Sequence, residues 1–174
     1  MIRITELTHK IIEEKKHIGI AIDMTCGRGN DTLFLARKAN KVYAFDIQEE
    51  AILSTSDLLK ENKIDNVELI LNNHDKVSEY VKEKFDVAIY NLGYLPKGNK
   101  DIKTTTSSTI DSLRQLITLM NLEGIIVIVI YPHDPEEGKA IEEFVLNLDS
   151  NFDCISYKVL NKKDCPYIIT IKKG

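Results

Sequence analysis

Hydrophobic residues along this chain follow two spacings, one typical of strands and one typical of helices. The two spacings alternate, which predicts that strands and helices alternate along the chain. The run 125–131 is apolar and mostly β-branched, which is typical of a strand buried on both faces of a sheet. Residues 49–62 instead place Ile52, Leu58 and Leu59 on one face of a helix. By the same criteria we expect further strands at 20–22, 41–46, 67–71, 85–90, 153–160 and 167–172, and further helices at 31–39, 108–120 and 135–148, with a short one ending at 82.

The two ends of the chain carry signals of their own. Residues 2–16 have apolar side chains at helical spacing from Ile4 to Ile12, which predicts a helix that packs over a sheet edge or covers a ligand. The last two expected strands alternate apolar and polar residues and lie close in sequence, so we expect an antiparallel pair at the edge of the sheet. Because no linker, repeat or low-complexity segment interrupts the pattern, residues 1–174 are predicted to form one doubly wound α/β domain.

Composition excludes several classes of protein. Of the 174 residues, 43% are hydrophobic and 29% are charged, which is typical of a globular domain. The longest apolar run is only strand-sized, whereas a membrane-spanning helix needs roughly 20 such residues. Charged residues interrupt the N-terminal stretch, so we expect no signal peptide there and a cytoplasmic protein. The three cysteines and four histidines lack disulfide or metal-ligand spacing, so we expect no metal.

A glycine-containing loop is the first candidate site. Residues 18–32 consist of an apolar strand, then Asp23, then a tight turn with Gly27 and Gly29, then the start of a helix. Glycine fits this turn because the chain adopts positive φ there and because a ligand can approach the backbone without meeting a Cβ. We interpret the loop as a nucleotide cradle, with a purely structural strand-to-helix turn as the alternative.

The residues around the two glycines favour one nucleotide over another. A dinucleotide fingerprint has a third glycine, whereas this chain has Thr32 at that position. Asp23 lies four residues before the first glycine. An acid at that position is instead typical of class I S-adenosylmethionine (AdoMet) methyltransferases. Asp23 and Asp31 can attract the cationic end of AdoMet, and they would repel a pyrophosphate. The expected fold is therefore the Rossmann-like class I AdoMet-dependent methyltransferase fold, a seven-stranded, mostly parallel sheet with an antiparallel edge pair.

The ends of the second and third strands offer further contacts for a nucleotide. In such a sheet the carboxyl ends of the parallel strands meet at one edge, where ligands bind. Asp46 ends the second strand, and its carboxylate can accept both hydroxyls of a ribose. His74 and Asp75 follow the third strand, where Asp75 can accept from the adenine amino group or, alternatively, cap a helix.

The fourth strand ends in Asn91-Leu92-Gly93-Tyr94, which is related to the N-P-P-Y tetrad of methyltransferases that act on exocyclic amines. In that tetrad an amide oxygen and a backbone carbonyl accept the N–H bonds of the amine and so aim its lone pair, while the aromatic ring stacks on the base. Asn91 and Tyr94 are therefore the candidate catalytic residues. Leu92 and Gly93 replace the two prolines, and the alternative is that Asn91 is a turn residue and Tyr94 belongs to the core.

The segment after this tetrad is the candidate contact for nucleic acid. The net charge of −4 argues against a broadly basic binding surface. Lys97, Lys100 and Lys103 nevertheless recur every third residue and form a local basic cluster, for which a solvated loop is the alternative. Ser108 is then expected to begin the next helix, with Asp111 as its partner in a weak capping box.

Several segments resemble one family along essentially the whole chain. They are N-D-T at 30–32, Y-A-F-D-I-Q at 43–48, N-L-G-Y-L-P at 91–96, D-I-K-T-T at 101–105 and S-S-T-I at 107–110. The family is a small bacterial one, long labelled rRNA methylases and now understood as tRNA 5-aminomethyluridine methyltransferases that act at the wobble position. The resemblance implies a homodimer that uses AdoMet to N-methylate the 5-aminomethyl group of the wobble uridine in the tRNA anticodon stem-loop.

The motifs and the resemblance together give two sets of site residues. Those expected to hold AdoMet are Asp23, Thr25, Gly27, Gly29, Asn30, Asp31, Thr32, Asp46, Ile47, Gln48, His74, Asp75, Asn91 and Leu92. Those expected to face the tRNA are Lys97, Lys100, Lys103, Thr104, Thr105, Ser107, Ser108 and Tyr131. The chain departs from the family after Tyr131, where His, Gly and His are expected and Pro132, His133 and Asp134 stand instead, so His133 is given no role.

Other functions remain open from the sequence. One is AdoMet-dependent methylation of a different amine, in rRNA or in a small molecule. Another is a non-catalytic dimer that binds AdoMet or RNA, and an NAD-linked dehydrogenase is the most distant alternative.

Overall fold

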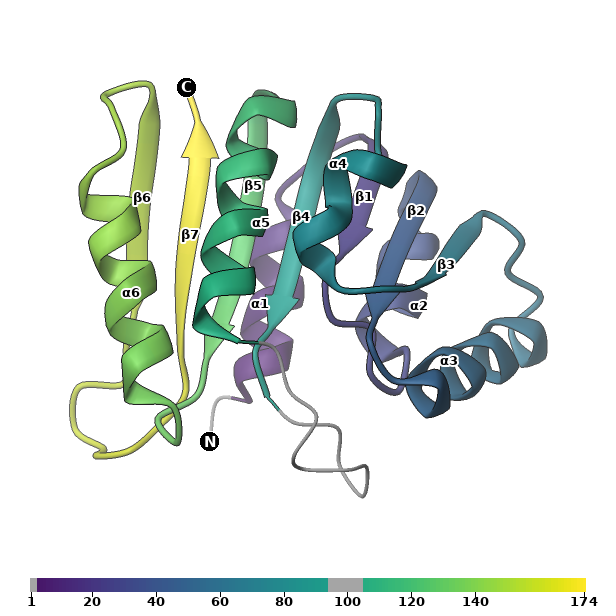
Figure 1. Cartoon of the computed structure of the whole chain (residues 1–174), viewed down its shortest axis with the longest axis horizontal. Helices are drawn as coiled ribbons and strands as arrows, with labels where there is room; N and C mark the ends of the chain where they lie inside the picture. Colours follow the sequence, from purple (N-terminus) through teal and green to yellow (C-terminus); the bar gives the residue numbers. More distant parts are fainter. Residues whose placement is uncertain (1–2, 94–104) are drawn as a thin grey trace.

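The computed structural model describes residues 3–93 and 105–174, and its centre is one seven-stranded sheet (Figure 1). The strand order is β3-β2-β1-β4-β5-β7-β6. The strands are β1 (Ile18–Asp23), β2 (Ala39–Asp46), β3 (Val67–Leu71), β4 (Phe85–Asn91), β5 (Met120–Ile130), β6 (Phe152–Tyr157) and β7 (Tyr167–Lys173). Strands β3, β2, β1, β4 and β5 pair in parallel, which confirms the predicted mostly parallel sheet.

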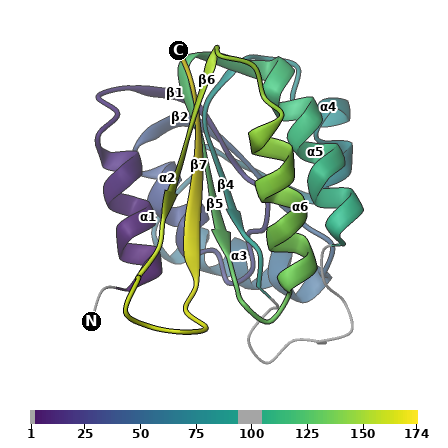
Figure 2. The same ribbon diagram turned by 90° about the vertical axis from the view of Figure 1, so that its left-hand side faces the viewer.

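Helices cover both faces of this sheet. Helices α5 and α6 lie over one face and α1 over the other (Figure 2). The helices are α1 (Ile4–Glu13), α2 (Asn30–Ala36), α3 (Glu49–Glu61), the short 3₁₀ helix η1 (His74–Lys76), α4 (Val77–Tyr80), α5 (Thr106–Leu119) and α6 (Pro135–Leu146). None of these helices in the described part of the chain is long and apolar enough to cross a membrane.

The predicted antiparallel pair is present at the edge of the sheet. Strands β6 and β7 pair antiparallel, with Cys154 opposite Ile171. Strand β7 also pairs antiparallel with β5, where Ile171 lies opposite Ile126, so only β6 is the outermost strand on this side. The last strand of the chain is thus inserted between its two neighbours.

Strand β5 explains why the core has two halves. Ile126, Ile128 and Ile130 belong to the apolar cluster on one face of the sheet, and Val127 and Val129 belong to the cluster on the other. All five side chains are buried, because successive side chains of a strand point to opposite faces and both faces carry helices. The prediction of a strand buried on both sides is confirmed.

The start of β5 was predicted wrongly. The strand begins at Met120 rather than at residue 125, and its pairing with β4 shifts register between Phe85 and Val87. The irregularity centres on Glu123, which has φ of 61°, and on Gly124, where a Cβ would lie 2.7 Å from Met120 Cγ. Glycine therefore marks a bend inside the strand, not a break before it.

Other boundaries also differ from the sequence prediction. Helix α2 ends at Ala36 and β2 begins at Ala39, so only two residues separate the helix from the strand. Strand β6 ends at Tyr157, so residues 158–160 lie outside it. These differences move the ends of elements and leave the order of elements as predicted.

The cap of α5 is also different from the one expected. Thr105 is the N-cap residue: its Oγ1 accepts from the Ser108 backbone N–H at 3.2 Å, and the Thr105 N–H donates to Ser108 Oγ at 3.1 Å. Ser108 is therefore the third residue of the helix and not its start. Asp111 instead forms an exposed ion pair with Arg114 at 3.1 Å.

Candidate active site at the carboxyl ends of the strands

The loop after β1 has the conformation that its glycines predict. Gly27 has φ of 52° and Gly29 has φ of 83°, which side chains other than glycine rarely adopt. Gly29 also caps the start of α2, and a Cβ there would lie 2.9 Å from atoms of Thr55. The turn therefore requires glycine for both its backbone angle and its close packing against α3.

Asp46 joins the end of β2 to this loop. Its Oδ2 accepts from the Gly27 N–H and its Oδ1 from the Gln48 N–H, both at 3.0 Å. Burial raises the pKa of the Asp46 carboxyl, while these backbone N–H groups oppose the rise. The carboxylate thus has a fixed orientation beside the glycine loop, and its predicted contact with a ribose stays a prediction.

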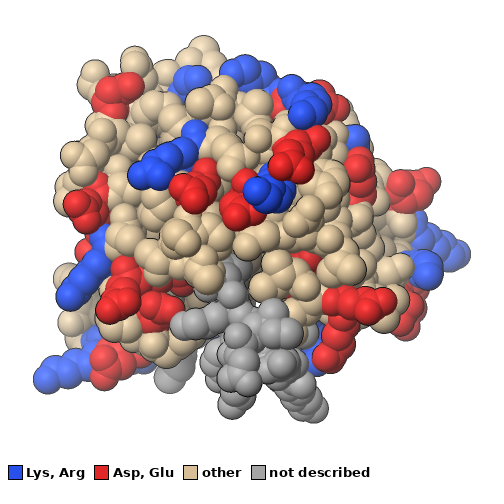
Figure 3. All heavy atoms as spheres, viewed as in Figure 1, with Lys and Arg blue, Asp and Glu red and all other residues tan. Residues whose placement is uncertain are grey.

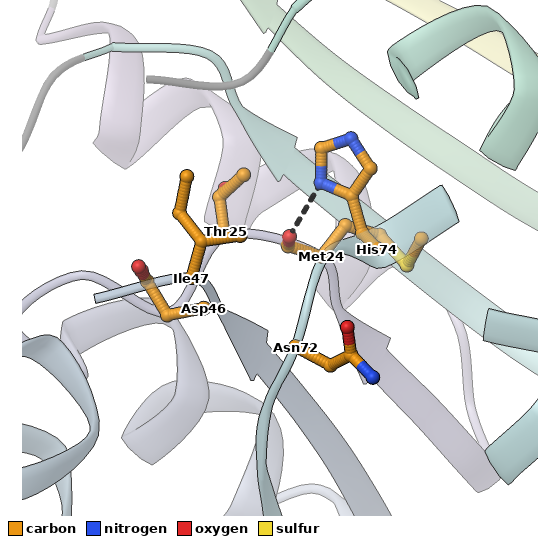
Figure 4. A pocket seen from close by; sticks show the side chains of 6 residues that line it. All are labelled: Met24, Thr25, Asp46, Ile47, Asn72 and His74. Carbon is orange, nitrogen blue, oxygen red and sulfur yellow. Dashed lines mark hydrogen bonds between the residues drawn. The ribbon is translucent and has the colours of Figure 1, made fainter. Parts of the chain in front are cut away.

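A small hollow opens next to Asp46 (Figure 4). The residues that line it are Met24, Thr25, Asp46, Ile47, Asn72 and His74. His74 Nδ1 lies 3.0 Å from the Met24 carbonyl oxygen and therefore donates to it. Burial lowers the pKa of His74, so the imidazole is neutral and its Nε2 is an acceptor.

Two buried polar atoms, one on His74 of this hollow and one on the next residue in the chain, lack partners within the described residues. They are His74 Nε2 and Asp75 Oδ1. Asp75 is not the N-cap of η1, because Asn73 Oδ1 accepts from the Asp75 N–H at 3.2 Å and serves as that cap. Buried polar atoms without partners are costly, so these two atoms are suited to a bound ligand that supplies the missing hydrogen bonds.

Asp23 lies beneath the glycine loop and is fully buried. Its Oδ1 accepts from the Thr25 N–H at 3.1 Å and its Oδ2 from the Thr32 hydroxyl at 2.6 Å, so it ties β1 to α2. Burial, and next the charge of Asp31, raise the pKa of Asp23 to about 7. The predicted attraction between Asp23 and the cationic end of AdoMet stays a prediction.

The raised pKa of Asp23 predicts a pH dependence of stability. The folded protein keeps a proton on Asp23 that the unfolded chain releases above about pH 4, so the free energy of unfolding falls as pH rises from about 4 to 7. The loss is at most roughly 4 kcal/mol, at about 1.4 kcal/mol per pKa unit. The variant Asp23→Asn should show a flatter profile, measured by urea unfolding at several pH values.

The exposed carboxylate of Asp111 provides the matched control for this experiment. Asp111→Asn makes the same change of side chain in a surface ion pair, and it should leave the pH profile of the free energy of unfolding as steep as in wild type. If Asp23→Asn also keeps the wild-type profile, Asp23 does not hold a proton in the folded state.

Asn91, at the end of β4, is held from three sides. Its backbone N–H donates to Thr25 Oγ1 at 2.8 Å, and its side-chain Nδ2 donates to Asp31 Oδ2 at 3.2 Å. Its Oδ1 accepts from the hydroxyl of Tyr131 at 2.8 Å. Burial, and then the charge of Asp31, raise the pKa of Tyr131, which keeps that hydroxyl protonated as a donor. The backbone oxygen of Asn91 also accepts from the Gly93 N–H at 2.8 Å, so Asn91 is a turn residue as well.

One residue of this cluster was not predicted from the sequence. His9 of α1 places its Nε2 2.7 Å from Asp31 Oδ1, and its ring lies parallel to that of Phe34 with centroids 3.8 Å apart. The helical pattern of residues 2–16 indicated that this helix covers a sheet edge or a ligand, but nothing in it related residue 9 to Asp31. Met24 and Asn72, which line the hollow, were not predicted either.

The other predicted residues fall into three groups. Ile47 lines the hollow, Gln48 begins α3 as its N-cap, Asn30 is exposed at the start of α2 and Leu92 is buried. Thr105 and Ser108 cap α5, beside the exposed Ser107. Tyr94, Lys97, Lys100, Lys103 and Thr104 lie outside the described residues. No group of three or more metal-binding side chains gathers within residues 3–93 and 105–174.

The strand order and the glycine loop after β1 define a class I methyltransferase fold, and similar proteins agree. The crystal structure of "a putative methyltransferase" from Streptococcus mutans in complex with SAH matches with a TM-score of 0.94 and 36% identity, over 100% of this chain and 99% of that one. The crystal structure of a "putative rRNA-methylase" from Clostridium thermocellum matches with a TM-score of 0.95 and 32% identity, with the same coverage. The predicted fold class is confirmed.

The sequence comparisons give the family. The family model described as "Putative rRNA methylase" matches residues 42–173. A curated relative from Arabidopsis thaliana, named tRNA (mnm(5)s(2)U34)-methyltransferase, chloroplastic, is 35% identical over 97% of this chain and 69% of its own length. The chain therefore belongs to this methylase family, as its sequence motifs predicted.

Proposed function

We propose that this protein is an AdoMet-dependent tRNA methyltransferase that N-methylates the 5-aminomethyl group of wobble uridine, which gives 5-methylaminomethyluridine with or without a 2-thio group. The observation that carries the proposal is the identity of 35% with the Arabidopsis tRNA (mnm(5)s(2)U34)-methyltransferase, because it extends over 97% of this chain. The SAH in the Streptococcus mutans structure supports the choice of cofactor.

The residues around the hollow fit AdoMet. Asp46 presents a carboxylate of fixed orientation, and the unpartnered His74 Nε2 and Asp75 Oδ1 are acceptors suited to an amino group such as that of adenine. AdoMet supplies an activated methyl group on a cationic sulfonium. The carboxylates of Asp31 and Asp46 favour a cationic ligand, whereas they would repel the pyrophosphate of a dinucleotide.

Asn91 supplies the chemistry that distinguishes an amine-methylating site. Its Oδ1 is held by the Tyr131 hydroxyl and keeps a second lone pair, which can accept an N–H of the target amine and so orient that amine. A primary alkylamine is mostly protonated at neutral pH, and only its neutral form has a lone pair to react. A neutral acceptor orients that form without stabilising the ammonium, as a carboxylate in the same place would.

The surface charge bears on how the protein would recognise tRNA. On the face seen in Figure 3, acidic and basic side chains are interspersed, and the described residues form no broad basic surface there. This pattern agrees with the net charge of −4 and favours a local contact with the anticodon stem-loop. We place the protein in the cytoplasm as a homodimer on the resemblance and the sequence alone.

Nucleoside analysis of tRNA tests the function directly. In cells that lack the protein, the methylaminomethyl wobble nucleoside should disappear and the aminomethyl precursor should accumulate, and expression of the wild-type chain should reverse both changes. Purified protein with AdoMet should convert the precursor in the isolated tRNA. An unchanged tRNA profile with loss of a methylated nucleoside from rRNA would instead favour the substrate in the family description, and no change in either RNA would contradict both.

A further inference from the structure

A chain of hydrogen bonds links the N-terminal helix to the end of β5. His9 Nε2 lies 2.7 Å from Asp31 Oδ1, Asp31 Oδ2 accepts from Asn91 Nδ2 at 3.2 Å, and Asn91 Oδ1 accepts from Tyr131 at 2.8 Å. The four residues come from α1, α2, the end of β4 and the position after β5. These hydrogen bonds therefore run from α1, which covers one face of the sheet, across the candidate site to Tyr131.

The donors and acceptors of this chain fix the orientation of the Asn91 amide. An ionised carboxylate only accepts, so Asp31 requires N–H donors from both His9 and Asn91. Asn91 must then turn its Nδ2 toward Asp31 and its Oδ1 toward Tyr131. The opposite orientation would set two acceptors against each other at Asp31 and would offer the target amine a donor in place of an acceptor.

His9 is the first member of this chain, and its own position is well supported. Its side chain is 28% exposed and that of Asp31 is 11% exposed, so their hydrogen bond is largely protected from water. The imidazole stacks on Phe34 with an interplanar angle of 1°. Thr8, Ile11 and Ile12 of the same helix are buried and hold α1 against the sheet.

We propose that His9 is a positioning residue for methyl transfer: its Nε2–H holds Asp31 Oδ1, so that Asp31 Oδ2 fixes the Asn91 amide with its oxygen toward the target amine. His9 acts through Asp31 and Asn91 and does not touch the reacting atoms. The inference deepens the proposed function and rests on it for its kinetic consequence, whereas its structural consequence for the Asn91 amide does not depend on the substrate.

Two substitutions separate the hydrogen bond from the packing of the ring. His9→Phe keeps an aromatic ring against Phe34 but cannot donate to Asp31. His9→Gln loses the ring but carries an N–H donor at a comparable reach. A merely structural role of His9 would be served better by Phe, whereas the proposed role would be served better by Gln.

A third variant controls for the docking of α1. Glu13 of α1 pairs with Lys38, which follows α2, at 3.3 Å, and this pair also links the two segments. Glu13→Gln removes that link without touching Asp31. Thermal unfolding of each variant shows that the comparison is made on folded protein.

The side-chain amide of Asn91 provides a signature that needs no substrate. Its pair of signals in a ¹H–¹⁵N spectrum is assigned by its loss in Asn91→Ala. We expect these signals to move in His9→Phe, to return toward the wild-type position in His9→Gln and to stay unmoved in Glu13→Gln. Unmoved signals in His9→Phe would overturn the proposal.

The kinetic measurement uses the full-length chain, AdoMet and tRNA that carries the aminomethyl nucleoside. His9→Phe should lower kcat roughly tenfold or more with KM for tRNA within about twofold, because a small misplacement of an orienting group mainly affects the reacting geometry. His9→Gln should recover most of kcat, and Glu13→Gln should match wild type. A wild-type kcat in His9→Phe also overturns the proposal, whereas a wild-type protein inactive on this tRNA contradicts the proposed function and leaves the spectral result to decide the role of His9.

Discussion

Replacing Asn91 by Ala is expected to lower the rate of methyl transfer roughly 100-fold or more, with the affinity for AdoMet changed much less. In the proposed function the Asn91 amide oxygen orients the target amine, and a misplaced nucleophile loses on the order of 10² in rate. The change also removes the donor to Asp31 Oδ2 and the acceptor for the Tyr131 hydroxyl. Single-turnover methylation of tRNA, together with calorimetry of AdoMet binding, measures the two effects separately.

Tyr131→Phe is the graded companion of this variant. It deletes only the hydroxyl that donates to Asn91 Oδ1, and it leaves the amide bonded to Asp31. We expect a smaller loss of rate than in Asn91→Ala, and a double variant no slower than Asn91→Ala alone, because both changes act on one oxygen. If Asn91→Ala keeps near wild-type turnover, Asn91 does not orient the amine. It is then only a turn residue, whose backbone oxygen accepts from the Gly93 N–H.

The parts of the fold that the sequence predicted are those set by local pattern. The alternation of Ile126, Val127 and Ile128 between two apolar clusters follows from strand geometry alone, so a β-branched run was enough to predict it. Gly27 and Gly29 were predicted as a turn at positive φ, because few other residues adopt that conformation. In both cases the cause lies within a few residues of its effect.

The parts that were missed depend on contacts between distant residues. His9 and Asp31 are 22 positions apart, and their hydrogen bond exists only because α1 folds back over the sheet beside α2. The bend at Gly124 depends on the neighbouring strand β4, where the register of the pairing shifts, so the strand was predicted to begin only at residue 125. Thr105, and not Ser108, is the cap of α5, because Ser108 Oγ accepts from the Thr105 N–H. Asp111 was expected to make this reciprocal bond.

Asp23 illustrates a residue whose importance was predicted but whose environment was not. The acid before the glycine loop was expected to attract the cationic end of AdoMet. In the structure both of its oxygens are used by Thr25 and Thr32, and its burial is complete. A sequence can show that an acid is present, but the packing around it decides whether that acid faces a ligand or supports the loop that does.

Replacing Asp46 by Ala is expected to weaken AdoMet binding about 10- to 100-fold, measured by calorimetry. A hydrogen bond to a charged acceptor contributes about 1.5 to 3 kcal/mol, and about 1.4 kcal/mol corresponds to a factor of ten in affinity. The Asp46 carboxylate is oriented before any ligand arrives, since its two oxygens already accept from the N–H groups of Gly27 and Gln48. Its loss therefore removes the proposed acceptor for the ribose and also loosens the glycine loop beside it.

Two further variants separate the ribose contact from simple loss of charge. Glu50→Gln removes an acid at the start of α3 that pairs with Arg28 of the loop at 3.3 Å, and we expect AdoMet affinity within about twofold of wild type because that pair is exposed. Asp46→Asn keeps one acceptor oxygen but replaces the other with a donor, so it can satisfy only one of the two backbone N–H groups. Its affinity should fall between those of wild type and Asp46→Ala. If Asp46→Ala binds AdoMet as wild type does, Asp46 only shapes the loop and the ribose is held elsewhere.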